Sequence, residues 1–269
     1  TKGTIMFKRV TLLVVAFSAI AFTAGAVVNA DVIQITPSLT EFTDDAGSGI
    51  SATKTYTHLL DFGPPGTAAT VNTVQFDKAG QKDVLSFSGT TTQGYGYLCE
   101  VDDLGSYQWN YAGGKTAYIG VASGTGMYTL LNDMSYGHGD HTYEKYTLSG
   151  LHAGTTYDFR LYYRPWDENS TRNAEILFDY GDGNVYKTPM INEDSMVGMP
   201  PYNATYLSFQ YTATAAGNLI VTIQQEAVST SWHNYGFSNE VFAVPEPSAL
   251  ALLACGLVGL LAYAWRKRR

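Results

Sequence analysis

Residues 148–164 of this 269-residue chain read LSGLHAGTTYDFRLYYR, and apolar and polar positions alternate along the second half of the stretch. Because successive side chains of a β-strand point to opposite faces of a sheet, this alternation predicts a strand over 156–164 with one face in a core. The first face carries Tyr157, Phe159, Leu161 and Tyr163, and the second carries Asp158, Arg160, Tyr162 and Arg164.

The segment just before this strand has a distinctive spacing. Tyr157 follows Leu151 by six residues and Gly154 by three. The pattern resembles the tyrosine corner of immunoglobulin-like and fibronectin type III sandwiches. The resemblance implies that the Tyr157 hydroxyl bonds to backbone upstream of the strand, and it favours a Greek-key sandwich.

Similar aromatic and β-branched segments recur through the middle of the chain, and no stretch before the C-terminal tail shows sustained helical periodicity. Gly181-Asp182-Gly183-Asn184 between two of them predicts a hairpin. The length suits one large sandwich, similar to galactose-binding-like carbohydrate modules, better than two small domains. We predict an all-β antiparallel sandwich of jelly-roll or Greek-key type over residues 31–243, with further strands at 32–36, 56–62, 84–88, 95–101, 116–121, 127–131, 174–180, 185–188, 207–211 and 219–223.

The N-terminal segment has the features of a signal peptide. Met6 is the expected initiator, and a short basic region is followed by an apolar run over 10–22 and by Val28-Asn29-Ala30. Small residues three positions and one position before a cleavage site fit signal peptidase. We therefore expect a signal peptide over residues 1–30, with cleavage between Ala30 and Asp31. The alternative, an N-terminal membrane anchor, would need a longer apolar run.

The C-terminal tail combines a proline motif, an apolar run and a basic cluster. The apolar run extends from Ala249 to Trp265, which is near the lower limit for a membrane-spanning helix. The basic cluster favours a cytoplasmic C-terminus. We predict a single transmembrane helix over this run, preceded by Val244, Pro245, Glu246, Pro247 and Ser248 and followed by Arg266, Lys267, Arg268 and Arg269.

This arrangement over residues 244–269 resembles the PEP-CTERM sorting tail. The resemblance implies that the chain is an exosortase substrate, held in the membrane by its tail helix until a cut near the motif releases or transfers the exported protein. It implies a location at the cell envelope and then at the cell surface or outside the cell. The alternative is a plain membrane anchor with an incidental Pro-Glu-Pro.

The charge of the exported part is strongly negative. Seven of the 16 basic residues lie in the two end segments, whereas all 24 acidic residues lie between Asp31 and Glu246. The exported part therefore has nine basic and 24 acidic residues, a formal net charge of −15. Such a surface repels phosphate backbones, which excludes nucleic acid as a partner, and it is compatible with Ca²⁺.

Only one of the two cysteines, Cys99, lies in the exported part, since Cys255 belongs to the tail. An internal disulfide is therefore not available, and the fold has to rest on burial. The strand-like setting of Cys99 predicts a buried and unreactive thiol.

Two segments combine tryptophan with polar groups in the way that sugar-binding sites require. Indole faces stack on the apolar faces of sugars, and neighbouring polar groups bond the hydroxyls. Trp232, His233, Asn234 and Tyr235 are the first choice, and Trp166 with Arg164 is the second. The alternative for each tryptophan is packing in the core.

Two short segments contain metal-ligand residue types. His138, Asp140 and His141 lie close together among glycines, and Asp179 and Asp182 have the spacing of oxygen ligands. A polar surface loop explains the first group and a hairpin turn explains the second. We expect no cofactor, with Ca²⁺ as the one ion that the acidic composition would suit.

The motifs of common enzymes are absent from the sequence. There is no Gly-x-Ser-x-Gly elbow and no phosphate loop, and Glu100, Asp102 and Asp103 are better explained as solvated acids than as a glycosidase pair. We expect a non-catalytic interaction module, with polysaccharide as its candidate ligand. Two alternatives stay open: a structural matrix component without a discrete ligand, and a hydrolase of extracellular polymer.

Overall fold

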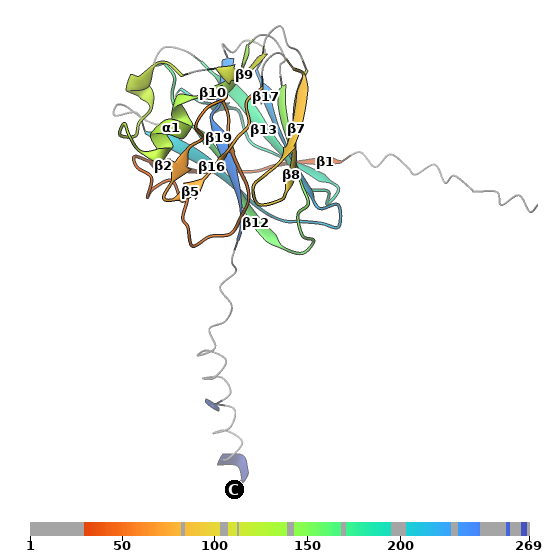
Figure 1. Cartoon of the computed structure of the whole chain (residues 1–269). Helices are drawn as coiled ribbons and strands as arrows, with labels where there is room; N and C mark the ends of the chain where they lie inside the picture. Colours follow the sequence, from red (N-terminus) through yellow and green to blue (C-terminus); the bar gives the residue numbers. More distant parts are fainter. Residues whose placement is uncertain are drawn as a thin grey trace, which may run out of the picture.

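The computed structural model describes residues 30–81, 84–102, 107–111, 113–138, 143–167, 171–194, 203–226, 231–242, 257–258 and 265–267. The described part of 30–242 is two large β-sheets packed face to face, with two small sheets at their margins (Figure 1). Among the described strands, only the pairs β1–β14 and β3–β6 are parallel. The predicted all-β sandwich is therefore confirmed.

The two large sheets take their strands from all along the chain. The larger one has the order β1 (Asp31–Gln34), β14 (Asn184–Lys187), β13 (Asn173–Asp179), β17 (Asn218–Gln225), β11 (Tyr143–Ser149), β8 (Gly96–Val101) and β7 (Ser86–Thr90), with β15 (Ile191–Asn192) beside β13. The second has the order β2 (Ser38–Phe42), β16 (Ala204–Thr212), β12 (Thr156–Tyr163), β19 (Gly236–Val241), β3 (Tyr56–Asp61) and β6 (Asp77–Lys78).

The remaining elements lie at the margins. One small sheet has the order β18 (Ser231–Asn234), β10 (Met134–His138) and β9 (Tyr107–Tyr111), and β4 (Thr70–Val71) pairs with β5 (Val74–Gln75). Helix α1 spans Gly126–Asn132, and η1, a 3-10 helix, spans Thr116–Tyr118. Figure 1 shows β9 and β10 at the end of the sandwich away from the C-terminal end of β19.

The order of strands explains how one chain closes both sheets. From β12 onward the chain passes repeatedly from one sheet to the other, through β13, β16, β17 and β19 in turn. Each crossing places strands that are consecutive in sequence on opposite layers, as in jelly-roll sandwiches. Residues far apart along the chain therefore meet at the ends of the sandwich.

Aromatic rings fill the space between the sheets. Phe178 of β13 stacks on Phe209 of β16 with centroids 4.1 Å apart and planes at 9°, and Tyr146 of β11 lies 5.2 Å from Phe237 of β19. Phe159, on the face of β12 predicted to be apolar, contacts both Phe178 and Phe237. Large rings of this kind contribute both buried area and specific geometry to a core.

The polar face of β12 is buried as well, which the alternation did not predict. Arg160 donates to Asp158 and Glu240 at 2.7 and 3.0 Å and to the carbonyl of Gly49 at 2.9 Å. Gly49 has φ +75°, and a Cβ there would lie 2.5 Å from the Arg160 guanidinium. The loop before β3 thus covers this face, and paired charges make the burial tolerable.

The tyrosine corner is present as the resemblance implied. The backbone N–H of His152 donates to the Tyr157 hydroxyl at 2.9 Å. A second tyrosine with the same separation, Tyr56 at the start of β3, accepts the N–H of Ser51 at 2.9 Å. Each hydroxyl ties the chain that enters a strand to the strand itself.

Two predicted strands are wrong. Residues 127–131 lie in α1, whose first turn is capped by the Thr125 hydroxyl and by the Asp45 carboxylate, which accepts the N–H groups of Gly126 and Met127 at 3.0 and 2.8 Å. Residues 116–121 begin with η1 instead of a strand. Thr125 is local to the helix, but Asp45 is remote in sequence, so the local pattern did not reveal this second cap. Cys99, in contrast, is free and fully buried as predicted, and burial raises its pKa well above the usual range.

Tyr157→Phe should lower the stability of the protein. The substitution leaves the N–H of His152 without its acceptor, which costs about 1 kcal/mol. For a domain of this size the melting temperature should fall by about 3 °C. Thermal unfolding followed by circular dichroism would measure it, with Tyr143→Phe, a half-buried tyrosine of β11, as the matched control. Equal melting temperatures for the two variants would contradict the role of the corner.

Candidate functional site

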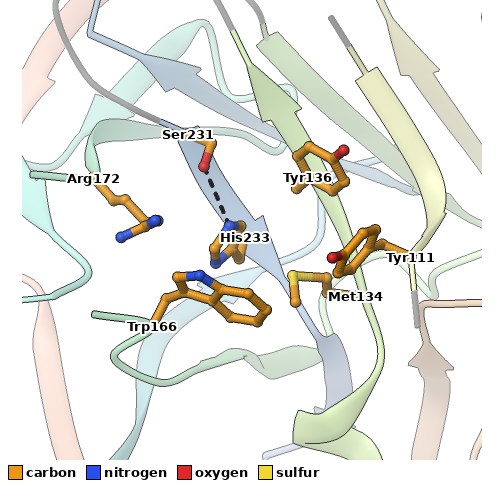
Figure 2. A pocket seen from close by; sticks show the side chains of 7 residues that line it. All are labelled: Tyr111, Met134, Tyr136, Trp166, Arg172, Ser231 and His233. Carbon is orange, nitrogen blue, oxygen red and sulfur yellow. Dashed lines mark hydrogen bonds between the residues drawn. The ribbon is translucent and has the colours of Figure 1, made fainter. Parts of the chain in front are cut away.

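A pocket opens beside the small sheet β18–β10–β9 (Figure 2). Its volume is about 190 Å³. Strand side chains form one wall, and the chain after β12 and before β13 forms the other. The lining residues are Tyr111, Met134, Tyr136, Trp166, Arg172, Ser231 and His233.

Aromatic rings dominate the rim. Tyr111 and Tyr136 meet edge to face with centroids 5.1 Å apart, and Trp166 meets the imidazole of His233 in the same way at 4.8 Å. Tyr111 is the most open of them, with 37% of its surface exposed. Edge-to-face packing fixes the ring planes, so the pocket has a preformed aromatic wall.

The alternation of β18 decides which side chains reach the pocket. Ser231 and His233 line it, whereas Trp232 and Asn234 point to the other face of the strand. Trp232 is only 2% exposed, and its indole N–H donates to the Asn234 side chain at 3.0 Å. Its ring packs 5.9 Å from Tyr163. Trp232 thus lies in the core, and the indole available to a ligand is that of Trp166.

Arg164 lies behind the pocket and supports it. It is fully buried, and its guanidinium donates to the carbonyls of Leu131, Gly114 and Pro165. The guanidinium also lies 5.1 Å from the ring centroids of both Trp166 and Tyr235. Such cation–π contacts hold Trp166 in place, so Arg164 positions the site and does not face a ligand.

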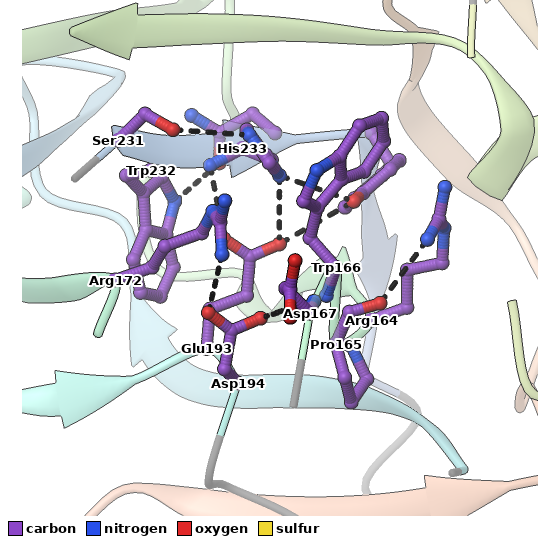
Figure 3. Close-up of polar contacts among 12 residues, drawn as sticks. Arg164, Pro165, Trp166, Asp167, Arg172, Glu193, Asp194, Ser231, Trp232 and His233 are labelled. Atoms are coloured by element: carbon purple, nitrogen blue, oxygen red, sulfur yellow. Dashed lines mark hydrogen bonds and ion pairs between the residues drawn. The ribbon is translucent and has the colours of Figure 1, made fainter. Parts of the chain in front are cut away.

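A buried carboxylate fixes the other wall of the pocket. Asp194 accepts the backbone N–H groups of Trp166 and Asp167 at 2.8 and 3.0 Å, and it forms an ion pair with Arg172 (Figure 3). Trp166 follows β12 and Arg172 directly precedes β13. Asp194, which follows β15, binds both of them. The geometry of the rim therefore depends on one acid that is itself 8% exposed.

A chain of polar contacts runs from the pocket into the core (Figure 3). Ser231 Oγ lies 3.2 Å from His233 Nε2, and His233 Nδ1 lies 3.4 Å from Glu193 Oε1. The second oxygen of Glu193 accepts the backbone N–H of His233 at 3.1 Å. The Tyr235 hydroxyl lies 3.4 Å from Glu193 Oε1. A hydroxyl, an imidazole and a carboxyl group are thus in series.

Burial sets the protonation of this chain. Burial, and then the positive charges of Arg172 and Arg164, lower the pKa of His233 well below its usual range. Burial, and then the charge of Asp194, raise the pKa of Glu193 well above its usual range. His233 is therefore neutral at physiological pH, and its 3.4 Å contact with Glu193 is not an ion pair.

The structure brings together part of the predicted ligand set. Trp166 and His233 meet at the pocket, whereas Arg164, Trp232, Asn234 and Tyr235 lie behind it. The sequence analysis missed the other lining residues and the two acids. Assigning 231–234 to a strand would have revealed that Ser231 and His233 share a face. No local signal connects Glu193 or Asp194 to the pocket.

Residues 243–269 match the family model of the PEP-CTERM protein-sorting motif. The chain carries a PEP-CTERM tail. This tail marks an exported protein that is anchored to the cell envelope before an exosortase cleaves it. The matched residues contain Val244, Pro245, Glu246, Pro247 and Ser248 as well as the terminal basic cluster, as the sequence predicted.

Comparison of the fold with solved structures gives distant likenesses. The CBM22-1 xylan-binding domain from Paenibacillus barcinonensis Xyn10C is 14% identical, with a TM-score of 0.30, over 62% of this chain and 99% of that domain. TmCBM61 in complex with β-1,4-galactotriose is 11% identical, with a TM-score of 0.28, over 60% of this chain and 91% of that one. Likenesses this weak do not bear on the ligand of this chain. None of the curated proteins matches the chain significantly in sequence.

The predicted signal peptide and the predicted transmembrane helix, which flank the sandwich, are not tested by the structure. Residues 1–29 of the predicted signal peptide lie outside the described residues. Most of the predicted transmembrane helix lies outside them as well. Residues 257–258 and 265–267 of the tail are helical. Within the described ranges, no helix has the length and apolar character to span a membrane.

The two metal candidates have different outcomes. The side chain of His138, together with Asp140 and His141, lies outside the described residues. Asp179 and Asp182 belong to the hairpin between β13 and β14, where Asp179 accepts the N–H of Gly181 at 2.8 Å. Asp182 accepts the N–H of Asn184 at 3.0 Å and the Tyr186 hydroxyl at 2.7 Å. In the part of the chain that the structure describes, no three acidic, histidine or cysteine side chains are grouped to hold a metal.

We expect Ca²⁺ to leave the melting temperature unchanged. Burial alone would raise the pKa of Asp182, but the hydrogen bonds from Tyr186 and Asn184 outweigh it and lower the pKa. These protein donors occupy the oxygens that an ion would need. Because a ligand that binds only the folded state raises the melting temperature, scans in EGTA and in millimolar Ca²⁺ test the point directly. An upward shift in Ca²⁺ that Asp182→Asn abolishes would establish an ion site in the hairpin.

Proposed function

We propose that the exported sandwich is a saccharide-binding module and that the pocket beside β18 receives one sugar unit of a larger polymer. The observation that carries the proposal is the preformed wall of Tyr111, Tyr136 and Trp166 around a cavity with polar groups on its inner side. Aromatic faces suit the C–H surfaces of a sugar ring, and Ser231, His233 and Arg172 suit its hydroxyls.

The size of the pocket favours a single ring as the unit that enters. Pockets for drug-sized molecules have volumes of roughly 300–1,000 Å³. A cavity of about 190 Å³ is smaller than these and fits a smaller group. A polymer would therefore engage the site through a chain end or one projecting residue, with the neighbouring units outside the pocket.

The charge of the protein favours a neutral saccharide. The exported part has a formal net charge of −15, and the cation at the pocket, Arg172, is already paired with Asp194. A polyanion would have to approach against this field without a free cation to receive it. We infer that, once the tail has been cleaved, the module acts at the cell surface or in the extracellular matrix.

Tyr111→Ala should weaken saccharide binding by about tenfold, which corresponds to about 1.4 kcal/mol. Tyr111 is exposed, so its removal takes away part of the wall with little effect on the fold. The measurement is retention of the purified full-length chain, in mild detergent, by a panel of immobilised neutral and acidic polysaccharides.

Trp166→Ala should reduce retention further, and Tyr128→Ala, a half-buried tyrosine of α1 outside the pocket, is the matched control. If the three variants were retained equally well, the saccharide would bind outside this pocket. If no polysaccharide retains the wild-type protein, the structural matrix component without a discrete ligand becomes the better explanation.

A further inference from the structure

The series of contacts from Ser231 to His233 and from His233 to Glu193 is more than sugar binding requires. Hydroxyls and imidazoles that bond sugars need only face the pocket, whereas here each group is also aligned on the next one. Ser231 Oγ lies 3.2 Å from His233 Nε2, and His233 Nδ1 lies 3.4 Å from Glu193 Oε1. A nucleophile, a base and an acid that orients the base, within hydrogen-bond reach of one another, form the arrangement used in acyl transfer on several unrelated folds.

His58, another buried histidine of the protein, shows that a buried imidazole does not always lie between a hydroxyl and a carboxyl group. His58 is also buried beside a hydroxyl, with Nδ1 3.0 Å from Thr57 Oγ1. Its other nitrogen bonds the carbonyl of Gly96 at 2.9 Å, so no carboxylate orients it. His58 does not line the pocket, whereas Ser231 and His233 both do.

We propose that Ser231 is a nucleophile and that the pocket hydrolyses small O-acyl esters, with His233 as general base and Glu193 as the positioning residue. Acylated saccharides are the substrate class that the proposed binding function would deliver, and that part of the inference rests on the proposed function. The nucleophilic role of Ser231 does not.

The reaction balances with water as the only co-reactant. Ser231 Oγ attacks the ester carbonyl carbon and its proton passes to His233 Nε2. The tetrahedral intermediate then breaks the ester C–O bond, and the alcohol leaves with the proton from His233. Water attacks the acyl-serine, His233 takes a proton from it, and the carboxylic acid departs as the proton returns to Ser231.

The surroundings of the series suit these steps. A neutral His233 is needed at the start, and burial with the charges of Arg172 and Arg164 lowers its pKa in that direction. Nδ1 lies 3.4 Å from Glu193 Oε1 and 3.5 Å from the Tyr235 hydroxyl, and with the imidazole proton on Nδ1 the other nitrogen, Nε2, can take the serine proton. Figure 2 shows the Arg172 guanidinium on the same side of the pocket as Ser231, and its ion pair with Asp194 holds it there.

The test is covalent labelling and ester hydrolysis by the purified full-length chain in mild detergent. A fluorophosphonate probe should label the protein, and peptide mass spectrometry should place the label on Ser231. Hydrolysis of p-nitrophenyl acetate should fall by about 10²–10⁴-fold in Ser231→Ala, as expected for loss of a nucleophile–base pair. Ser149→Ala, which removes a hydroxyl bonded to the Gly96 carbonyl, is the matched control and should keep full labelling and rate.

Glu193→Gln separates positioning from folding. It keeps the size of the side chain and should lower kcat with little change in KM or in melting temperature, because it alters the orientation of His233 and not the pocket wall. A folded Ser231→Ala variant that retains the wild-type rate, or a label on any other residue, would overturn the proposal. A folded wild-type chain that neither reacts with the probe nor hydrolyses the ester would overturn it as well.

Failure of the inference and failure of the proposed function can be told apart. Ser231→Ala keeps the three aromatic rings, so saccharide retention by this variant reports binding alone. Retention without labelling of the wild type leaves the binding module and removes the esterase. Labelling of Ser231 without saccharide retention would support the esterase and contradict the binding module.

Discussion

The stacking of aromatic rings between the two sheets is the interaction on which the structure of this protein depends. With a single cysteine in the exported part, no internal disulfide can hold the layers together. Phe178 and Tyr146 from one sheet meet Phe159, Phe209 and Phe237 from the other, and these contacts hold the sheets in register. The pocket lies at one end of the sandwich, so the positions of its walls depend on the packing of this core.

Buried charged groups fix the loops that surround this aromatic core. Arg160 joins Asp158, Glu240 and a loop carbonyl on one face of β12, and Asp194 joins Arg172 to the backbone at Trp166 beside the pocket. In both places a buried charge has partners from distant parts of the chain. Such groups are costly when any one partner is lost, so each cluster accepts one arrangement of its loop and resists others.

Local pattern predicted what depends on local physics. The alternation over 156–164 placed β12, and the spacing around Tyr157 predicted its hydrogen bond to His152. The same reasoning failed for α1, because the Asp45 carboxylate that caps it is remote in sequence. It also selected Trp232 as a ligand residue, since composition shows that an indole is present and cannot show which face of a strand it occupies.

The pocket shows most clearly that residue type and local pattern do not reveal which residues the pairing of strands brings together. Trp166 and His233 could be identified from residue type, but Glu193 and Asp194 lie beside the pocket because β15, which precedes them, pairs with β13. A register shift of one residue in β18 would exchange Ser231 and His233 for Trp232 and Asn234. What could not be predicted was therefore the pairing of strands, and with it the chemistry that the pairing assembles.

The position of the pocket relative to the tail has a mechanical consequence. β18, which carries His233, continues through Tyr235 into β19, and the sorting motif begins just beyond the end of β19. If the pocket holds a polymer as we propose, part of the tension between that polymer and the envelope would run along this stretch of chain while the tail anchors the protein. β19 is hydrogen-bonded to β12 on one side and to β3 on the other. Because these bonds lie across the direction of pull, they are loaded in shear all together, and the strand resists peeling away from the sheet.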